Sequence, residues 1–283
     1  MVGTASTVRS WLLLEHGGPW GREAFRDARL PRGFGSELLA RCRAARVRPL
    51  LIRRPRRDGQ GVACIAIRSG PERPWIERTQ LGRIEDALGL DLAALGHGRR
   101  LGMEPVPGVM FLVCTHGRHD PCCAERGRPV AGALADAFPE ATWEASHVGG
   151  DRFAGNLIAF PHGLYLGRVG PHEAPRVAGA YLGGRVPLDH LRGRSCWPMP
   201  VQAAEHALRT ELSLDGVEDV SVERSLRDGE EVVVTFRTAT GQSHEVRVEV
   251  GASDPRALTC RSNSEEPIPE YRVRSVRSGR NEP

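Results

Sequence analysis

The sequence of 283 residues contains no lysine, so its 39 strongly basic side chains are all arginine. These arginines are scattered and the formal net charge is only +4, which excludes the concentrated basic footprint of a typical nucleic-acid-binding protein. Aromatic residues make up only 5% of the chain. No apolar run is long enough for a membrane span or the core of a signal peptide, the N-terminal stretch SWLLLEHGG included. We therefore expect a globular cytoplasmic protein.

Cysteine is also scarce, with seven residues in the chain. An odd number that includes the adjacent pair Cys122 and Cys123 argues against the disulfide framework of a secreted domain. Three of the seven nevertheless fall in one segment, FLVCTHGRHDPCCAE (Phe111–Glu125), together with two histidines. Three interpretations stay open: a metal or iron–sulfur site, a redox dithiol, or simple packing. The absence of a C-x-x-C spacing disfavours a thioredoxin-type dithiol.

The middle of the chain alternates between strand and helix patterns. The apolar run around Phe111 predicts a strand, and the spacing in Arg128–Phe138 predicts a helix with Pro129 in its first turn. Further strands are expected in ATWEASHVGG, NLIAFPHG and LYLGRVG, followed by a helix over Glu173–Gly184. This β-α-β, then β-β-α, order is that of a thioredoxin-like domain, so the fold class is α/β.

The first hundred residues repeat this pattern in weaker form. WLLLEHGGPWG resembles FLVCTHGRHDP, and a helix in SELLARCRAARV and strands in RPLLIRR and GVACIAIRS follow it. Glu15 stands where the second copy has Cys114, so the first copy lacks the ligand groups. We therefore predict a degenerate thioredoxin-like domain at residues 1–104 and a second thioredoxin-like, ferredoxin domain at residues 105–195.

The last ninety residues, 196–283, predict a small α+β extension. MPVQAAEHALRTELSL has the apolar spacing of an amphipathic helix, and EEVVVTFRTATGQSHEVRVEV predicts a hairpin around TATGQS. The tail after Glu265 is rich in proline, arginine and serine, so we expect it to fray.

A second polar segment, SHVGGDRFAGN (Ser146–Asn156), follows one of the predicted strands. His147 precedes Gly149 and Gly150, which allow a close approach of the backbone, and Asp151 follows four residues after His147. The segment has neither the lysine of a P-loop nor the spacing of a dinucleotide-binding loop, so it is not predicted to cradle phosphate.

Together CTHGRHDPCC, SHVGGDRFAGNLIAFPHGLYLGRV and GRSCWPMPVQAAEHALR resemble the sucrase/ferredoxin-like family, in its actinobacterial branch. Fungal relatives hold a 2Fe–2S cluster through two cysteines and two histidines. The resemblance implies that Cys114, Cys123 and His147 are ligands and that Asp151 takes the place of the second histidine. A carboxylate is a harder ligand than imidazole, so substitutes are considered. These alternative ligands are Cys122, Cys196 and His116; His116 and His119 are otherwise read as polar turn residues near the site.

The resemblance implies a non-catalytic electron carrier or redox sensor, although enzyme activity is left open. Histidine ligation raises the potential of a cluster, from about −400 mV for all-cysteine plant-type ferredoxins to roughly −150 to +300 mV in Rieske centres. The arginines of the same region, Arg118, Arg126 and Arg152, are candidates for docking an acidic redox partner. The alternatives are a zinc site built from the same ligands, a thiol-based redox protein, and an interaction protein without metal. No pair of carboxylates suggests glycoside hydrolysis.

Overall fold

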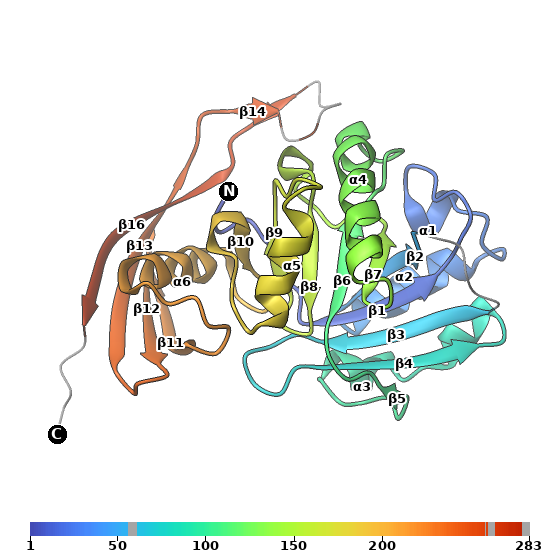
Figure 1. The fold of residues 1–283 in the computed structure, drawn as a ribbon, viewed down its shortest axis with the longest axis horizontal. Coiled ribbons are helices and arrows are strands. Elements are labelled where there is room, and N and C mark those ends of the chain that lie inside the picture. Colours follow the sequence, from blue (N-terminus) through green and yellow to red (C-terminus); the bar gives the residue numbers. More distant parts are fainter. Residues whose placement is uncertain (56–60, 258, 260–263, 279–283) are drawn as a thin grey trace.

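The computed structural model describes residues 1–55, 61–257, 259 and 264–278. Figure 1 shows a large mixed sheet with helices, followed by a smaller sheet at the C-terminal end. The large sheet has the strand order β10-β9-β8-β6-β7-β2-β1-β3-β4-β5. The predicted α/β class is thus confirmed at the level of a mixed sheet with helices. No helix of the described residues has the length and apolar character needed to cross a membrane.

The first half of the chain forms the part of this sheet with the order β2-β1-β3-β4-β5. Its elements are β1 (Ser10–Glu15), α1 (Ala24–Asp27), α2 (Phe34–Ala44), β2 (Val47–Arg53), β3 (Val62–Arg68), β4 (Trp75–Leu81), the 3-10 helix η1 (Ile84–Gly89), α3 (Leu92–Gly96) and β5 (Glu104–Pro105). β1 is parallel to β2 and antiparallel to β3, and β3 is antiparallel to β4. The sequence interpretation missed β4 and α3.

The second half repeats this arrangement as β7-β6-β8-β9, with β10 at the edge. Its elements are β6 (Met110–Cys114), α4 (Pro121–Ala137), β7 (Thr142–Ala145), η2 (Asp151–Phe153), β8 (Leu157–Phe160), β9 (Leu164–Leu166), α5 (Ala174–Leu182), η3 (Leu188–His190) and β10 (Leu191–Arg194). β6 is parallel to β7 and antiparallel to β8, as β1 is to β2 and β3. The two halves meet where β2 and β7 pair antiparallel, with Ile52 opposite Ala145 and Arg53 opposite Glu144.

Both halves share one apolar core. The strands of the first half run across those of the second in Figure 1. One apolar cluster contains side chains of both halves, among them Leu13 and Leu112. Trp11 of β1 meets Phe160 of β8 edge-on, with their ring centroids 5.2 Å apart. Cys114 and Cys123 belong to the same cluster and are both buried. The two cysteines therefore lie within this shared core, out of bulk water.

Helix α4 differs from the prediction that it begins near Arg128. It begins at Pro121, and the side chain of Asp120 accepts a hydrogen bond of 2.9 Å from the backbone N–H of Cys122. An aspartate N-cap followed by proline at the first helical position is a strong start signal, because proline lacks the N–H that would stay unpaired there. Pro129 consequently lies inside the helix. Cys123 is therefore held on a helical turn.

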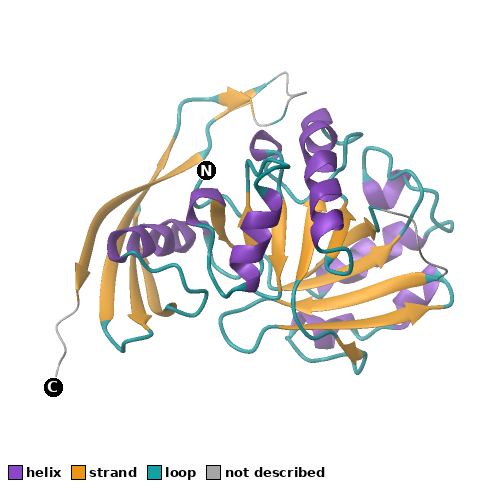
Figure 2. Ribbon diagram, viewed as in Figure 1, coloured by secondary structure: helices purple, strands orange, loops and turns teal. Residues whose placement is uncertain are grey.

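The C-terminal part forms a helix on a four-stranded sheet, as Figure 2 shows. Its elements are α6 (Met199–Leu212), β11 (Val220–Asp228), β12 (Glu231–Thr238), β13 (Ser243–Ala252), β14 (Arg256–Ala257), β15 (Glu265–Glu266) and β16 (Pro269–Ser278). The expected fraying after Glu265 is wrong for residues 269–278, which pair antiparallel with β13. Tyr271 and Val276 pack against the apolar cluster under α6, which gives this strand its anchoring side chains.

Candidate metal centre

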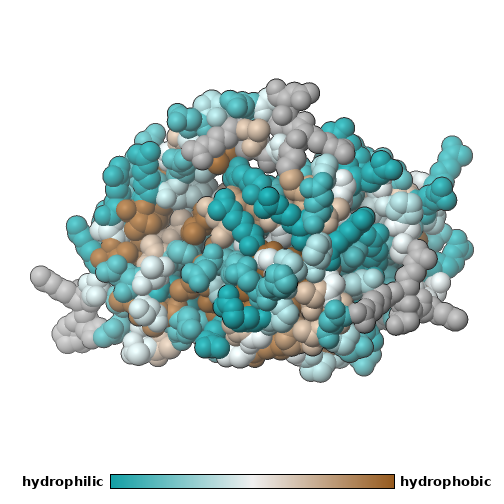
Figure 3. Space-filling model, turned by 45° about the horizontal axis from the view of Figure 1, so that its top comes forward, coloured by the Kyte–Doolittle hydropathy of each residue, from teal (hydrophilic) through white to brown (hydrophobic). Residues whose placement is uncertain are grey.

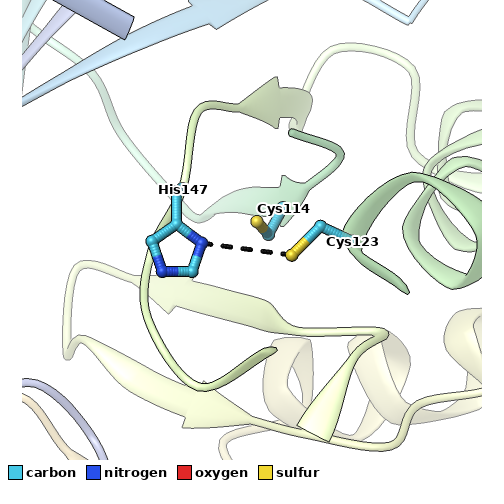
Figure 4. A group of neighbouring side chains, drawn as sticks. All are labelled: Cys114, Cys123 and His147. Atoms are coloured by element: carbon cyan, nitrogen blue, oxygen red, sulfur yellow. Dashed lines mark hydrogen bonds between the residues drawn. The ribbon is translucent and has the colours of Figure 1, made fainter. Parts of the chain in front are cut away.

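Two cysteines and a histidine from three separate segments converge at one end of the second half (Figure 4). Cys114 is the last residue of β6, Cys123 lies in the first turn of α4, and His147 follows β7. Their sulfur and ring nitrogen atoms all lie within 4.8 Å of one another. The Sγ atom of Cys123 is 4.0 Å from Nδ1 of His147. The structure thus brings together three of the residues that the sequence singled out.

Asp151 of η2 adjoins this group and forms a second potential ligand group with His119 and His147. Its Oδ1 atom lies 3.2 Å from Nδ1 of His147 and 3.8 Å from Sγ of Cys123. The Asp151 side chain is only 4% exposed, whereas that of His147 is 22% exposed. The two cysteines therefore form the buried end of the site, and the His147–Asp151 pair forms its more open end.

The tight packing of α4 on β6 results from a glycine. A Cβ atom on Gly127 would lie 2.0 Å from the carbonyl oxygen of Cys114, so no larger residue fits at this position. This close approach, one turn after Cys123, brings the helix and the strand end together. The distance between the two sulfur atoms therefore follows from backbone packing rather than from the loop between them.

The buried site does not accommodate all of its acidic groups in charged form. A hydrogen bond from Cys123, with help from His147, holds the pKa of Cys114 well below its usual range. The same interaction with Cys114, together with burial, raises the pKa of Cys123. Burial also raises the pKa of Asp151. Two thiolates and a carboxylate would repel one another at these distances, and a bound cation would remove that repulsion.

His119 takes part in the site, although the sequence interpretation read it as a turn residue. Its ring stacks on that of His147, with centroids 3.8 Å apart and an angle of 19° between the planes. His119 also forms a second potential metal-binding group with His147 and Asp151. Its Nδ1 atom lies 3.3 Å from the carbonyl oxygen of Arg22, in the first half of the chain. The H-x-x-H-D spacing before α4 was the available sequence signal.

His116 supports His147 but its ring nitrogens are already engaged. Its Nδ1 atom accepts a hydrogen bond of 3.1 Å from the backbone N–H of His147, and its Nε2 atom lies 2.9 Å from the carbonyl oxygen of Gly21. Because Nδ1 accepts, Nε2 carries the proton and donates to Gly21. Burial lowers the pKa of His116, which favours this neutral form. The predicted role of His116 as a substitute ligand is not supported by these contacts.

The loop between His147 and Asp151 is held by two residues that the sequence interpretation missed. Arg192 of β10 donates to the carbonyl oxygen of Gly149 at 3.0 Å and to Oδ1 of Asn156 at 2.7 Å. Asn156 in turn donates to the carbonyl oxygen of Gly150 at 2.8 Å. A Cβ atom on Gly150, whose φ is +83°, would lie 2.3 Å from the Arg192 guanidinium. Glycine is therefore required where the arginine approaches.

The other sequence candidates lie outside the converging group. Neither of the two groups of potential ligands among the described residues contains Cys122 or Cys196. Cys122 is disulfide-bonded, and Cys196 is a buried free cysteine whose carbonyl oxygen accepts a hydrogen bond of 3.1 Å from Arg9. The three arginines proposed for docking are all exposed; they are Arg118 before α4, Arg126 in α4 and Arg152 in η2.

The donor set fits a metal centre. The ligand atoms of Cys123, His147 and Asp151 lie 3.2 to 4.0 Å from one another, and Sγ of the buried Cys114 lies within 4.8 Å of those of Cys123 and His147. Thiolate and imidazole are the ligands that zinc and iron–sulfur clusters use, while the carboxylate is the harder member of the set.

Comparison with known proteins identifies the family of the chain. A search of curated proteins and a search of solved structures found no significant match. A family model described as sucrase/ferredoxin-like matches residues 1–193. The match spans both halves of the large sheet and includes all four residues of the site, Cys114, Cys123, His147 and Asp151. The chain therefore belongs to the sucrase/ferredoxin-like family.

Proposed function

We propose that this chain is an electron carrier or redox sensor that holds a 2Fe–2S cluster through Cys114, Cys123, His147 and Asp151. The convergence of a thiol pair and an imidazole–carboxylate pair carries the proposal. Such a cluster, when bound, supplies one-electron chemistry. The protein contributes a buried sulfur end, an imidazole that reaches the surface and a polar loop that fixes Asp151.

The ligand pairs suit the two irons of such a cluster. With a cluster bound, the two thiolates would hold one iron, and Nδ1 of His147 with a carboxylate oxygen of Asp151 would hold the other. A carboxylate adds negative charge where relatives have a second neutral imidazole. Since more negative charge lowers the reduction potential of a cluster, we expect a potential below that of a two-histidine site.

The proposal includes a tandem thioredoxin-like architecture. Its support is the repeated strand order, β2-β1-β3-β4 in the first half and β7-β6-β8-β9 in the second. In the first half, Glu15 stands in the place of Cys114, and its Oε2 atom accepts a hydrogen bond of 3.2 Å from the N–H of Ala63. We accordingly propose the boundaries 1–104, 105–195 and 196–283, with one metal centre in the second unit.

We also propose that a redox protein with an acidic surface is the partner. The exposed arginines at the open end, Arg118, Arg126 and Arg152, would steer such a protein toward His147. The electrostatic attraction predicts that electron transfer to an acidic partner slows as ionic strength rises.

A zinc site is the second candidate, and one observation favours it. The measured separations, 4.0 Å for Cys123–His147, 3.8 Å for Cys123–Asp151 and 3.2 Å for His147–Asp151, are close to the edges of a single tetrahedron. Bonds of about 2.0 to 2.3 Å around one zinc ion give ligand separations of roughly 3.3 to 3.8 Å. Such a site would be structural, or a metal-controlled thiol site without electron transfer.

The deciding experiment is anaerobic purification followed by analysis of iron, zinc and acid-labile sulfide. Two irons and two sulfides per chain, with a rhombic EPR signal after reduction by dithionite, would establish the cluster. One zinc per chain and no sulfide would establish the second candidate. No iron after reconstitution with iron and sulfide would reject the cluster proposal.

Asp151→His then tests the role of the carboxylate. If Asp151 binds the second iron, this variant keeps the cluster and raises its reduction potential, because a neutral ligand replaces an anionic one. An unchanged potential and EPR spectrum would show that Asp151 is not a ligand. Asp136→His, on the far part of α4, is the control variant.

A further inference from the structure

A cleft adjoins the open end of the metal centre. It consists of two neighbouring cavities of about 350 and 440 Å³, the first of which is lined by His147 and Asp151. Six residues line both cavities: Thr4, Arg152, Phe153, Ile268, Pro269 and Tyr271. The cleft thus lies between the N-terminal segment, η2 and β16. Each volume falls within the range of about 300 to 1,000 Å³ that is usual for small-molecule sites.

Three guanidinium groups surround a single aromatic ring beside this cleft. The Cζ atoms of Arg152, Arg168 and Arg192 lie 4.7, 5.7 and 5.0 Å from the centroid of the Phe153 ring. Phe153 is buried, whereas Arg152 and Arg168 are exposed. Like charges so close together repel one another, and the ring can offset only part of this repulsion through cation–π contacts.

Two of these three guanidinium groups, those of Arg168 and Arg192, form no ion pair within 4.0 Å with a carboxylate of the described residues. Arg192 donates instead to uncharged acceptors, including the hydroxyl and the carbonyl oxygen of Thr4 at 3.2 and 2.6 Å. Glu270 in the cleft lies 3.8 Å from Arg272.

The backbone also holds Arg168 at the cleft against its preference. Its φ is +56°, a left-handed conformation that is uncommon for a residue with a side chain. The Arg168 N–H donates to the carbonyl oxygen of Phe153 at 2.9 Å, which fixes the two residues side by side. A conformation of this kind is maintained only where the surrounding structure enforces it.

We propose that this cleft binds a phosphorylated small molecule with an apolar or aromatic part. The phosphate lies against Arg152 and Arg168, because guanidinium groups match phosphate oxygens in charge and in bidentate geometry. The apolar part lies along Ile268, which precedes β16, and Tyr271 of β16. Figure 3 shows mostly hydrophilic side chains on the face that it presents, with smaller apolar areas among them. The residues assigned to the phosphate and to the apolar part are not among the proposed metal ligands, although His147 and Asp151 line the adjoining part of the cleft, so binding can be tested without the cluster.

Isothermal titration of the protein as purified with phenyl phosphate, inorganic phosphate and benzyl alcohol tests this site. We expect phenyl phosphate to bind about tenfold more tightly than inorganic phosphate, a gain of about 1.4 kcal/mol from its ring. Benzyl alcohol, which lacks the anion, should bind too weakly to measure. Equal affinities for phenyl phosphate and inorganic phosphate, or binding of benzyl alcohol alone, would overturn the proposal.

Two arginine variants locate the bound anion. Arg168→Gln and Arg152→Gln should each weaken phenyl phosphate binding by about tenfold, as expected for loss of a charge-assisted hydrogen bond. Arg176→Gln removes an arginine that is 70% exposed on α5 and should leave binding unchanged. No binding at 10 mM, or equal binding by all variants, would contradict the proposal. If a chain that contains no iron or sulfide still binds phenyl phosphate, the cluster proposal is rejected and the proposal for this cleft stands.

Discussion

The backbone N–H of His147 donates a hydrogen bond to Nδ1 of His116, with a donor–acceptor distance of 3.1 Å. The same imidazole donates through Nε2 to the carbonyl oxygen of Gly21 at 2.9 Å. One buried ring therefore connects a proposed ligand in the second half to a turn of the first half. The first half lacks the ligand groups, but it contributes to the position of His147.

His116→Phe tests this connection. Phenylalanine keeps the ring, including its edge-on contact with Trp20, but loses both hydrogen bonds and leaves the N–H of His147 unpaired. Loss of these bonds should lower the free energy of unfolding by about 1 to 3 kcal/mol and reduce the metal content of the purified protein. Urea denaturation and metal analysis measure the two effects. His172→Phe, at an exposed position, is the control, and equal results for the two variants would contradict the prediction.

Cys114→Ser and Cys123→Ser should each remove most of the bound metal, because a serine hydroxyl is a poor ligand for iron or zinc at neutral pH. Cys196→Ser provides the matched control, since Cys196 is also buried and free but lies outside the converging group. Metal and sulfide analysis of the three purified variants is the measurement. If only the Cys196→Ser variant lost its metal, the metal site would lie elsewhere in the chain.

His162 should make the protein sensitive to mild acid. Its Nδ1 atom lies 2.6 Å from the hydroxyl of Tyr181, and burial lowers the pKa of His162 from 6.5 to about 4. Because the folded state takes up this proton at a lower pH than the unfolded state, the unfolding free energy falls as pH drops from 6.5 to about 4.

His162→Gln should weaken this pH dependence, since glutamine does not titrate. Urea midpoints at pH 7 and pH 4.5 for the wild type and the variant measure the effect. His172→Gln, an exposed histidine, should keep the full dependence of the wild type. A wild-type midpoint that is constant over this range would contradict the prediction.

A buried group of three charges links β10 and α6. The Oε1 atom of Glu205 lies 2.7 Å from Nε of Arg194 and 3.0 Å from Nε of Arg209, and the three side chains are 2%, 5% and 0% exposed. Glu205→Gln leaves two buried cations without their anion and should cost about 3 to 5 kcal/mol of unfolding free energy. Glu211→Gln removes an exposed carboxylate of the same helix and should cost little. Chemical denaturation compares the two.

Local patterns in the sequence predicted much of this fold. Apolar runs predicted β1 and β6, and helical spacing predicted α5 and α6, since these patterns are short-range. The start of α4 was misplaced because Pro129 was taken for a first-turn proline, a role that Pro121 fills. The strand β16 was missed because its pairing with β13 compensates for a polar composition that suggests fraying.

The candidate site was predictable only in part. The spacing of the cysteines and the family resemblance pointed to Cys114, Cys123, His147 and Asp151, which the structure places together. The contributions of His119 and Arg192 depend on contacts between segments that are distant along the chain, and no local pattern encodes such contacts. The grouping of arginines around Phe153 was likewise not predictable from the sequence.

The pairing of β2 with β7 has a consequence for any attempt to study the second half alone. These two strands cover each other's backbone edge through residues 52–53 and 144–145. A fragment of residues 105–195 would present β7 as an open edge, ready to accept another strand. Two such fragments can satisfy this edge by pairing with each other, so the isolated unit should self-associate. Within the intact chain, the first half takes the place of that second molecule and acts as a permanent internal partner.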